Sequence, residues 1–505
     1  MIRRVVDFAL NNRLLVLAFA VLLFAGGIVA FHDLPIEAYP DVADNYVEII
    51  TQWPGISAEQ IEQQVTIPLE IAMGGIPDVV HLRSFSLFGL SDLKLIFNDE
   101  STNEWNRERV LERLSQVTLP PGVNPQMGTD WSPVGQIYFF TLHSTNPAYD
   151  PMELKSVEDW VVEKNFKSVP DIVDVSSFGG PTREYQVRLD PNKLVAYGLS
   201  LAQVEQQLTN NNANAGGSFI QQGLQQINVR EVGMVDRTQD IAETVILTKN
   251  GTPLRVKDLG VVSQGPKIRL GQTAKSIHED GKIFDDDDAV SGIALLRKGA
   301  PADTALQALH EKVKEMNDRI LPKGVKIVPF IDRSDLVRFT SHTVLHNLTE
   351  GMILVSIILF LFLGNVRGAL IVAATIPFAL LFASICLDLR HIPANLLSLG
   401  ALDFGMVVDG AVVMVENIVR HQNLRSGDTK TGRERISEAS HEVQRPVFYA
   451  IAIIITAYLP IFTLQRVEGR LFHPMAWTVA FALAGALIFS IVIAPVLCSY
   501  AFAKG

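Results

Sequence analysis

The chain has 505 residues, of which 48% are hydrophobic, and its mean hydropathy of +0.23 indicates a membrane protein. A formal net charge of −11 argues against nucleic acid as a partner. The two cysteines, Cys386 and Cys498, both lie in apolar runs, which excludes a disulfide framework.

The first residues predict a membrane anchor. Residues 1–12 mix charged and apolar side chains, which predicts a short amphipathic interfacial helix, and the apolar run 14–31 predicts the first span. A cleaved signal peptide is the alternative, but the run is too long for its hydrophobic region and no small-residue cleavage site precedes Pro35. We therefore expect residues 1–31 to form an uncleaved anchor with a cytoplasmic N-terminus.

Residues 32–340 contain no apolar run of spanning length, which predicts a large soluble domain. Within it, residues 76–86 resemble residues 169–179, and each copy carries a Pro-Asp pair at its second and third positions. Strand and helix patterns around both copies suggest two split βαβ, ferredoxin-like subdomains, the second including a strand at 185–189. A weaker third unit covers residues 289–330.

Beyond this domain, a helix is expected to begin near Asp332 and to run directly into the second span. Residues 420–445 carry six Arg and Lys side chains and predict a cytoplasmic loop with a surface helix. Six spans in total would place both termini on the cytoplasmic side. The apolar runs that predict spans two to six are 345–363, 369–387, 396–419, 447–464 and a part of 476–501.

The fourth span carries three acidic residues, Asp403, Asp409 and Glu416. A carboxylate at bilayer depth costs at least about 2.5 kcal/mol, so such residues usually face a bundle interior or a water-filled path. On a helix, Asp409 and Glu416 share one face about 10 Å apart, and Asp403 lies about 120° around the axis from Asp409. This arrangement predicts a proton path. A helix end that dips into water is the alternative, and it suits only Glu416.

The motif Asp-Phe-Gly-x-Val-Val-Asp-Gly-Ala-Val-Val-Met-Val-Glu-Asn, residues 403–417, resembles the fourth transmembrane helix of the RND efflux permeases, specifically of their heavy-metal efflux branch. The drug-efflux branch usually has two adjacent aspartates where this chain has Asp409-Gly410, and it lacks an acid at Asp403. The resemblance extends over residues 35–498. It implies that Asp403, Asp409 and Glu416 carry the protons that drive export.

The resemblance also implies an α+β membrane protein of the Gram-negative inner membrane with a large periplasmic domain. The implied parts are an interfacial helix and first span at 1–31, a first porter subdomain at 32–135, a second porter subdomain at 136–198 and 273–331, a docking subdomain at 199–272, and the remaining spans at 332–505. The docking hairpin would reach a neighbouring protomer of a homotrimer. A mobile surface insertion explains the whole segment 199–272, with its polar tract at 210–217, as well. A periplasmic adaptor protein and an outer-membrane channel are the implied partners.

Family members contain two similar halves of six spans each, and this chain resembles the N-terminal half only. The predicted spans hold no Lys or Arg in their apolar cores. A second six-span half is therefore expected to supply the cation that balances the carboxylates.

The metal ligands are less clear than the proton path. The periplasmic histidines form no His-x-His or His-x₃-His pair. The resemblance places the acidic ligands of zinc-type members near Gln136 and Asp174, and an amide is a poor zinc ligand. Thioethers suit monovalent copper or silver, and Met406 and Met414 lie on one side of the fourth span, but membrane packing explains both. These four residues are the metal candidates, and the metal itself stays open.

The sequence contains no Gly-x₄-Gly-Lys-Ser/Thr phosphate loop, so ATP is not the driver and no enzyme activity is expected. No cofactor is expected either, because a metal cation would be the substrate and the proton the coupling ion. Two alternatives stay open. One is an RND exporter of small organic molecules or lipids, against which Asp409-Gly410 argues, and the other is a half-subunit with no transport of its own.

Overall fold

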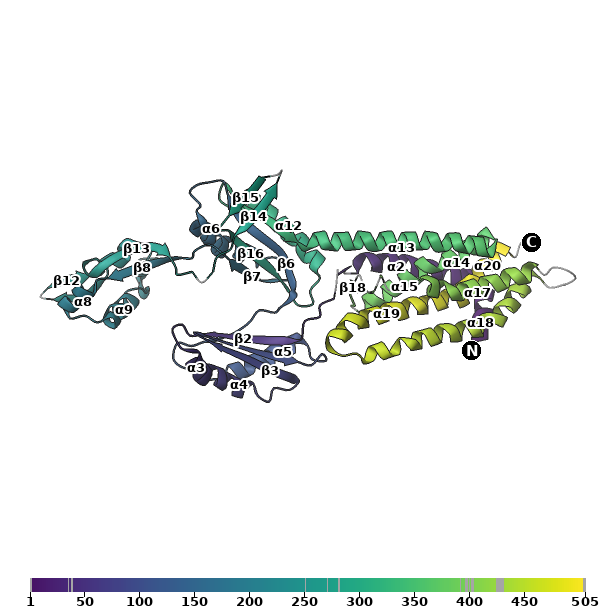
Figure 1. The fold of residues 1–505 in the computed structure, drawn as a ribbon, viewed down its shortest axis with the longest axis horizontal. Coiled ribbons are helices and arrows are strands. Elements are labelled where there is room, and N and C mark those ends of the chain that lie inside the picture. Colours follow the sequence, from purple (N-terminus) through teal and green to yellow (C-terminus); the bar gives the residue numbers. More distant parts are fainter. Residues whose placement is uncertain are drawn as a thin grey trace.

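The structure is a computed structural model that describes residues 2–34, 36–37, 40–249, 251–269, 271–279, 282–390, 392–395, 398, 400, 404–423 and 431–502. Figure 1 shows an elongated molecule with a helical bundle at one end and β-sheets with a projecting arm at the other. Both ends of the described chain lie at the end of the bundle farther from the sheets (Figure 1).

The bundle is formed by helices from the two ends of the chain. It comprises α1 (Ile2–Asn11), α2 (Arg13–Asp33), α13 (Arg333–Leu363), α14 (Val366–Ala373), α15 (Thr375–Leu389), α17 (Phe404–Asn423), α18 (Gly432–Ala457), η4 (Leu459–Thr463), α19 (Arg466–Ile488), η5 (Phe489–Ile493) and α20 (Ala494–Phe502). Among the described residues, four helical stretches have the length and apolar composition of a membrane span: Arg13–Asp33, Val366–Leu389, Gly432–Thr463 and Arg466–Phe502. Thr349–Leu363, within α13, is a shorter apolar helix.

The centre of the bundle forms around α17, because its apolar stripe is enclosed by α14, α18, α19 and α20. The buried residues of this stripe are Val407, Val408, Ala411, Met414, Val415 and Ile418, all between 0% and 4% exposed. The amphipathic helix α1 also packs here. Its apolar residues Val6, Ala9 and Leu10 are at most 3% exposed and lie against the bundle rather than on an open surface.

Two helices of the bundle meet through a glycine. A Cβ added at Gly27 of α2 would lie 2.5 Å from the Cβ of Leu381 in α15 and 3.0 Å from its carbonyl oxygen. Small residues allow such close backbone approach between membrane helices, which associate through packing rather than through the hydrophobic effect. Gly27 therefore sets the separation of α2 and α15.

The segment predicted as a cytoplasmic loop is different in the structure. Residues 420–423 end α17, and residues 432–445 begin α18. Thr431 starts α18 with a capping box, because its Oγ1 accepts from the backbone N of Glu434 at 3.4 Å and its own N donates to Glu434 Oε2 at 2.8 Å. The helix then continues through Pro446 into the fifth apolar run. The expected surface helix and the fifth span are thus one element.

The first sheet is built from one continuous stretch of chain. Its strands are β2 (Tyr46–Gln52), β3 (Val79–Leu87), β4 (Leu90–Phe97) and β5 (Pro125–Met127), in the antiparallel order β3-β4-β2-β5. Alternate residues of β2 and β4 are buried, and helices cover that face: α3 (Ala58–Ile61), η1 (Glu62–Thr66), α4 (Ile67–Met73) and α5 (Asn103–Leu114). This order is that of a split βαβ unit.

The second sheet has the same kind of order but is discontinuous in sequence. Its strands are β6 (Trp131–Ser144), β7 (Ile172–Phe178), β16 (Val290–Arg297) and β17 (Val325–Asp332), in the order β17-β6-β16-β7. Its helices are α6 (Pro151–Val157), η2 (Glu158–Val162), α7 (Glu163–Phe166), α12 (Ala302–Glu315) and η3 (Met316–Ile320). The weaker third unit of the sequence therefore completes the second sheet.

The two sheets share the turn that the repeat encodes. In the Pro-Asp pairs before β3 and β7, Asp78 has φ 66° and Asp171 has φ 64°. Asp tolerates this left-handed conformation better than most residues other than Gly. The repeat is thus a shared helix-to-strand turn.

The arm lies between β7 and β16. Here β8 (Arg183–Leu189), predicted in the second subdomain, instead pairs with β13 (Gly260–Pro266). The other elements of the arm are α8 (Pro191–Tyr197), α9 (Leu201–Asn210), α10 (Thr238–Glu243), β11 (Val245–Lys249), β12 (Thr252–Arg255), α11 (Val256–Leu259) and the hairpin of β9 (Ala215–Gln222) with β10 (Gln225–Glu231). The hairpin of β14 (Lys275–Glu279) with β15 (Lys282–Asp286) follows the arm in sequence and lies beside the second sheet (Figure 1). A short parallel pair, β1 (Ile36–Glu37) with β18 (Ala394–Asn395), links the chain after α2 to the segment before α17.

Candidate functional site

Helix α17 has one exposed stripe, and the stripe carries acidic residues. Gly405, Asp409, Val413, Glu416 and Arg420 are exposed and follow each other at intervals of three or four residues. Asp409 and Glu416 therefore lie on one face, as their spacing predicts. Asp403, the third predicted acid, lies outside the described residues.

Gly410, the residue after Asp409, allows α17 to pack closely against α18 and η5. A Cβ added at Gly410 would lie 2.9 Å from Ile451 Cδ1 and 3.1 Å from both Ser490 Oγ and Val447 Cγ1. Ser490 itself donates to the carbonyl oxygen of Ala486 at 2.7 Å. Because Gly410 has no side chain of its own, the side chains of α18 and η5 pack directly against the backbone of α17 beside Asp409.

The far end of α17 is fixed to α18 by hydrogen bonds. The buried Asn417 donates from Nδ2 to the carbonyl oxygen of Ala439 at 2.9 Å and to Glu442 Oε2 at 3.0 Å. His421 Nε2 lies 3.5 Å from the same Glu442 oxygen. This end of α17 is therefore anchored to α18.

The structure brings two of the four metal candidates near each other but does not form a site from them. Gln136 of β6 and Asp174 of β7 both pair with Leu295 of β16. Lys167 Nζ lies 2.8 Å from Asp174 Oδ1. Burial lowers the pKa of Lys167, but hydrogen bonds to Asp174 and Glu163 outweigh burial and raise it. Asp174 is therefore held by an ammonium group that a metal would have to displace.

The methionines give no further support to a metal site. Met414 is fully buried in the central core of the bundle, whereas Met406 packs in a different cluster, with α18 and α19. In the part of the chain that the structure describes, no group of three or more His, Cys, Asp or Glu side chains is arranged to hold a metal ion.

The second subdomain contains a buried carboxyl that the sequence analysis did not single out. Glu158 of η2 has 0% exposure, and its Oε2 lies 3.4 Å from Lys155 Nζ. Burial raises the pKa of Glu158 to about 7, although Ser177 and Lys155 oppose the shift. The sequence did not indicate this site because Glu158 has charged neighbours, Lys155 at i−3 and Asp159 at i+1, and this pattern is also typical of a solvated helix face.

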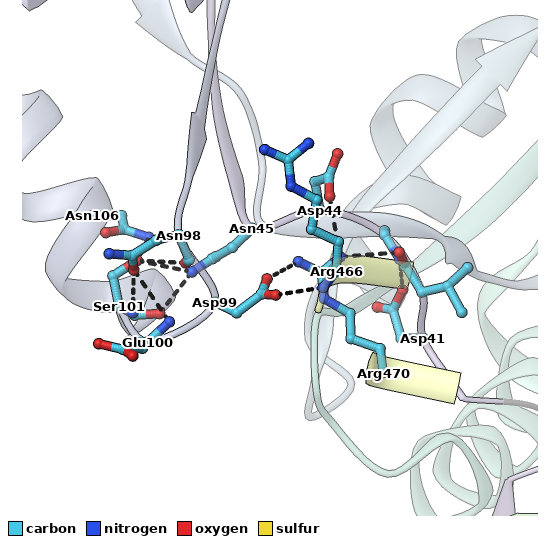
Figure 2. A network of polar contacts seen from close by, with 12 residues as sticks. Asp41, Asp44, Asn45, Asn98, Asp99, Glu100, Ser101, Asn106, Arg466 and Arg470 are labelled. Atoms are coloured by element: carbon cyan, nitrogen blue, oxygen red, sulfur yellow. Dashed lines mark hydrogen bonds and ion pairs between the residues drawn. The ribbon is translucent and has the colours of Figure 1, made fainter. Parts of the chain in front are cut away.

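A polar network between distant segments was also missed (Figure 2). It joins Arg466 and Arg470, at the start of α19, to Asp44 and Asp99 near the first sheet. In the sequence, the two arginines themselves, Arg466 and Arg470, were the only indication of such a contact. Their partners lie more than 360 residues away, at separations of 367 to 426 residues.

Comparisons with known proteins agree on the kind of protein that the chain is similar to. The model of the AcrB/AcrD/AcrF family matches residues 5–504. The cation efflux system protein CzcA of Alcaligenes sp. is 40% identical over 98% of the chain, and the cation efflux system protein CusA of Escherichia coli is 36% identical over 99%. A crystal structure of a heavy metal efflux pump superposes with a TM-score of 0.86 at 40% identity and covers 98% of the chain.

The same comparisons measure how much of each relative the chain represents. It covers 47% of the Alcaligenes protein, 48% of the Escherichia coli protein and 48% of the pump in the crystal structure. The chain thus spans about half the length of the relatives it matches.

Proposed function

The chain belongs to the AcrB/AcrD/AcrF family and to its heavy-metal efflux branch, and from this premise we propose that it is the N-terminal half of a proton-driven permease that exports heavy-metal cations. The observation that carries the proposal is the open stripe of α17, where Asp409 and Glu416 share one face of the central helix. Ionisable groups on a membrane helix have a high free-energy cost, so they are usually found only where they serve a path for ions.

The proposed topology has six spans in the inner membrane. The apolar part of α13 and the whole of α17 would join the four apolar stretches, and the sheets would then be periplasmic, as ferredoxin-like porter subdomains. The position of both chain ends at the far end of the bundle supports an even number of crossings (Figure 1).

In the proposed cycle, a proton from the periplasm neutralises Asp409, and its later release toward the cytoplasm restores the charge. Loss of the charge changes the cost of placing α17 against apolar neighbours. Through the contact at Gly410, α17 then shifts α18 and η5, and the shift reaches the porter subdomains. Asp403 would extend the path, and Glu416 would complete it.

We further propose that the stripe of α17 packs against a second six-span half. That half would place a Lys or Arg beside Asp403 or Asp409, because the predicted spans of this chain hold no Lys or Arg in their apolar cores. The β9–β10 hairpin, with Phe219, Ile220 and Leu224 between 55% and 107% exposed, would dock on a neighbouring protomer of a trimer. A periplasmic adaptor and an outer-membrane channel would complete the export path.

The test is metal-dependent proton flux in proteoliposomes that contain the chain together with its second half. Zinc, cobalt, cadmium and monovalent copper are supplied one at a time, and a pH-sensitive dye reports the protons. Asp409→Asn keeps the shape of the side chain but removes the titratable group, so we expect flux to fall by about a hundredfold or more. Asp388→Asn, at the sheet-side end of α15, is the matched control and should keep normal flux.

Full metal-coupled flux in Asp409→Asn would contradict the assignment of Asp409 to the proton path. Proton flux that responds to organic cations or lipids, and to none of the metals, would favour the organic-molecule exporter. Coupled flux by this chain without a second half would refute the need for that half.

A further inference from the structure

The segment between α2 and the first sheet, residues 40–45, is held from two sides. On one side, Arg470 of α19 donates from Nη1 to the carbonyl oxygen of Val42 at 3.0 Å and to Asp44 Oδ1 at 3.2 Å. On the other side, Lys298, which follows β16, donates from Nζ to the carbonyl oxygen of Asp44 at 2.6 Å. The linker is therefore the place where the bundle, the first sheet and the second sheet meet.

Asp99, at the end of β4, connects the first sheet itself to α19 (Figure 2). Its Oδ1 accepts from Arg470 Nη2, and its Oδ2 accepts from the backbone N of Arg466 at 3.1 Å. Arg466 has φ 53°, a left-handed conformation that a non-Gly residue adopts only where its surroundings hold it. The first turn of α19 is thus fixed by a carboxylate of the first sheet.

The energetics favour a rigid connection. The Arg470 side chain is 19% exposed and binds two carboxylates and one carbonyl oxygen. Both terminal nitrogens of its guanidinium group therefore contact the linker or the first sheet. Removal of the guanidinium would leave both Asp44 and Asp99 without this partner, and Asp99 also lines a cleft of about 420 Å³. On the side of the second sheet, Lys298 hydrogen-bonds the linker through the backbone carbonyl oxygens of Ala43 and Asp44.

Helix α19 also leads directly to the proton site. Ser490, which touches the position of Gly410, lies 20 residues beyond Arg470 on the same continuous run of helix from α19 into η5. At about 1.5 Å per residue, this run spans roughly 30 Å. This run of helix, which includes Pro474, connects the neighbourhood of Gly410 to Arg470.

We propose that Arg470 is a positioning residue that makes the first sheet move as one body with α19, and thereby couples the proton step to the opening and closing of the porter subdomains. The proposal rests on the proposed function, since it requires a proton step on α17. The competing interpretation is a static clamp that only stabilises the fold.

The first test measures movement and needs no transport. Spin labels are placed at Glu108 of α5 and Lys164 of α7, which are both exposed, in a variant without Cys386 and Cys498. We expect Asp409→Asn, a mimic of the protonated state, to change the distance distribution between the two labels in the reconstituted full chain. Adding Arg470→Ala should abolish the change, and adding Arg470→Lys should retain part of it.

Two further variants keep this test decisive. Asp99→Asn removes the charge from the other side and preserves shape, so it should also abolish the change even if Arg470→Ala folds poorly. Arg390→Ala is the matched control. Arg390 lies over the Trp477 ring of α19 at 4.6 Å, and among the residues that the structure describes it makes no hydrogen bond to the first sheet, so the change should persist.

The second test measures coupling in proteoliposomes with the second half present. Arg470→Ala should lower the amount of zinc moved per proton by about fivefold or more, the usual scale of a coupling free energy, while proton uptake continues. A static clamp would instead lower zinc and proton fluxes together.

The proposal is wrong if the distance change persists in both Arg470→Ala and Asp99→Asn, if Asp409→Asn causes no distance change at all, or if Arg470→Ala lowers both fluxes in proportion. A wild-type chain that moves no metal would refute the proposed function alone. The label distances would then still decide whether Arg470 connects α17 to the first sheet.

Discussion

The contact between α2 and α15 at Gly27 gives a sharp test of the bundle. In Gly27→Ala, the new Cβ would meet the Cβ, carbonyl carbon and carbonyl oxygen of Leu381 at 2.5 to 3.1 Å. Carbon atoms pack at about 3.5–4.0 Å, so the two helices must separate by about 1 Å. None of the contacted atoms is the end of a flexible side chain, so a rotamer change cannot relieve the overlap.

Overpacking of this kind costs about 1–3 kcal/mol, while replacement of Gly by Ala within a helix returns about 0.5–1 kcal/mol. We expect Gly27→Ala to lower the free energy of unfolding by about 1–2 kcal/mol. The neighbouring Gly26→Ala is the matched control, because its Cβ would meet only Ile385 Cδ1, at 4.0 Å. It should be neutral or slightly stabilising.

The measurement is unfolding of the purified chain in mixed micelles, followed by tryptophan fluorescence. In a double-mutant cycle, Leu381→Gly removes the facing Cβ, so the loss caused by Gly27→Ala should be smaller in the Leu381→Gly background than in wild type, whereas a Leu381→Ala background should leave that loss unchanged. Equal stability of Gly26→Ala and Gly27→Ala would refute the close approach of α2 and α15.

Two predictions concern the second subdomain. Burial raises the pKa of Glu158 from 4.5 to about 7, so folding takes up a proton between these values and the free energy of unfolding should fall as pH rises through this window. Glu158→Gln should flatten this dependence in thermal unfolding measured from pH 4 to pH 8, and an unchanged pH profile would contradict the burial of this carboxyl. Asp150 accepts from the backbone N of Met152 at 3.0 Å and of Glu153 at 2.8 Å at the start of α6, so Asp150→Ala should lower stability by about 1 kcal/mol in the same assay. Asp150→Asn keeps the acceptor and should stay within a few tenths of wild type, and equal losses in both variants would argue against the cap.

Features encoded by neighbouring residues could be predicted from the sequence. Apolar residues alternate along β4 and are buried on one face, and Ser57 starts α3 by accepting from the backbone N of Gln60. The shared face of Asp409 and Glu416 follows from helical geometry alone. Their role as proton carriers stays a prediction.

Features that depend on distant partners could not be predicted. The pattern of β8 is that of a strand, but nothing in it indicates that the partner is β13 rather than β7. The charged residues of 432–445 resemble those of a loop, although they belong to the N-terminal part of the long helix α18. Likewise, Lys167 on Asp174 and Arg470 on Asp99 join elements whose proximity only the fold creates.

The discontinuous second sheet has a consequence for how the protein is made. Strand β16 lies between β6 and β7, so these two strands have no common partner until the whole arm has been synthesised. The first sheet, by contrast, is complete once β5 has emerged. Unpaired strand edges favour aggregation, and long loops slow their closure. Ribosome stalling or cleavage within the arm would therefore release a chain with one complete sheet and two strands whose edges are unpaired.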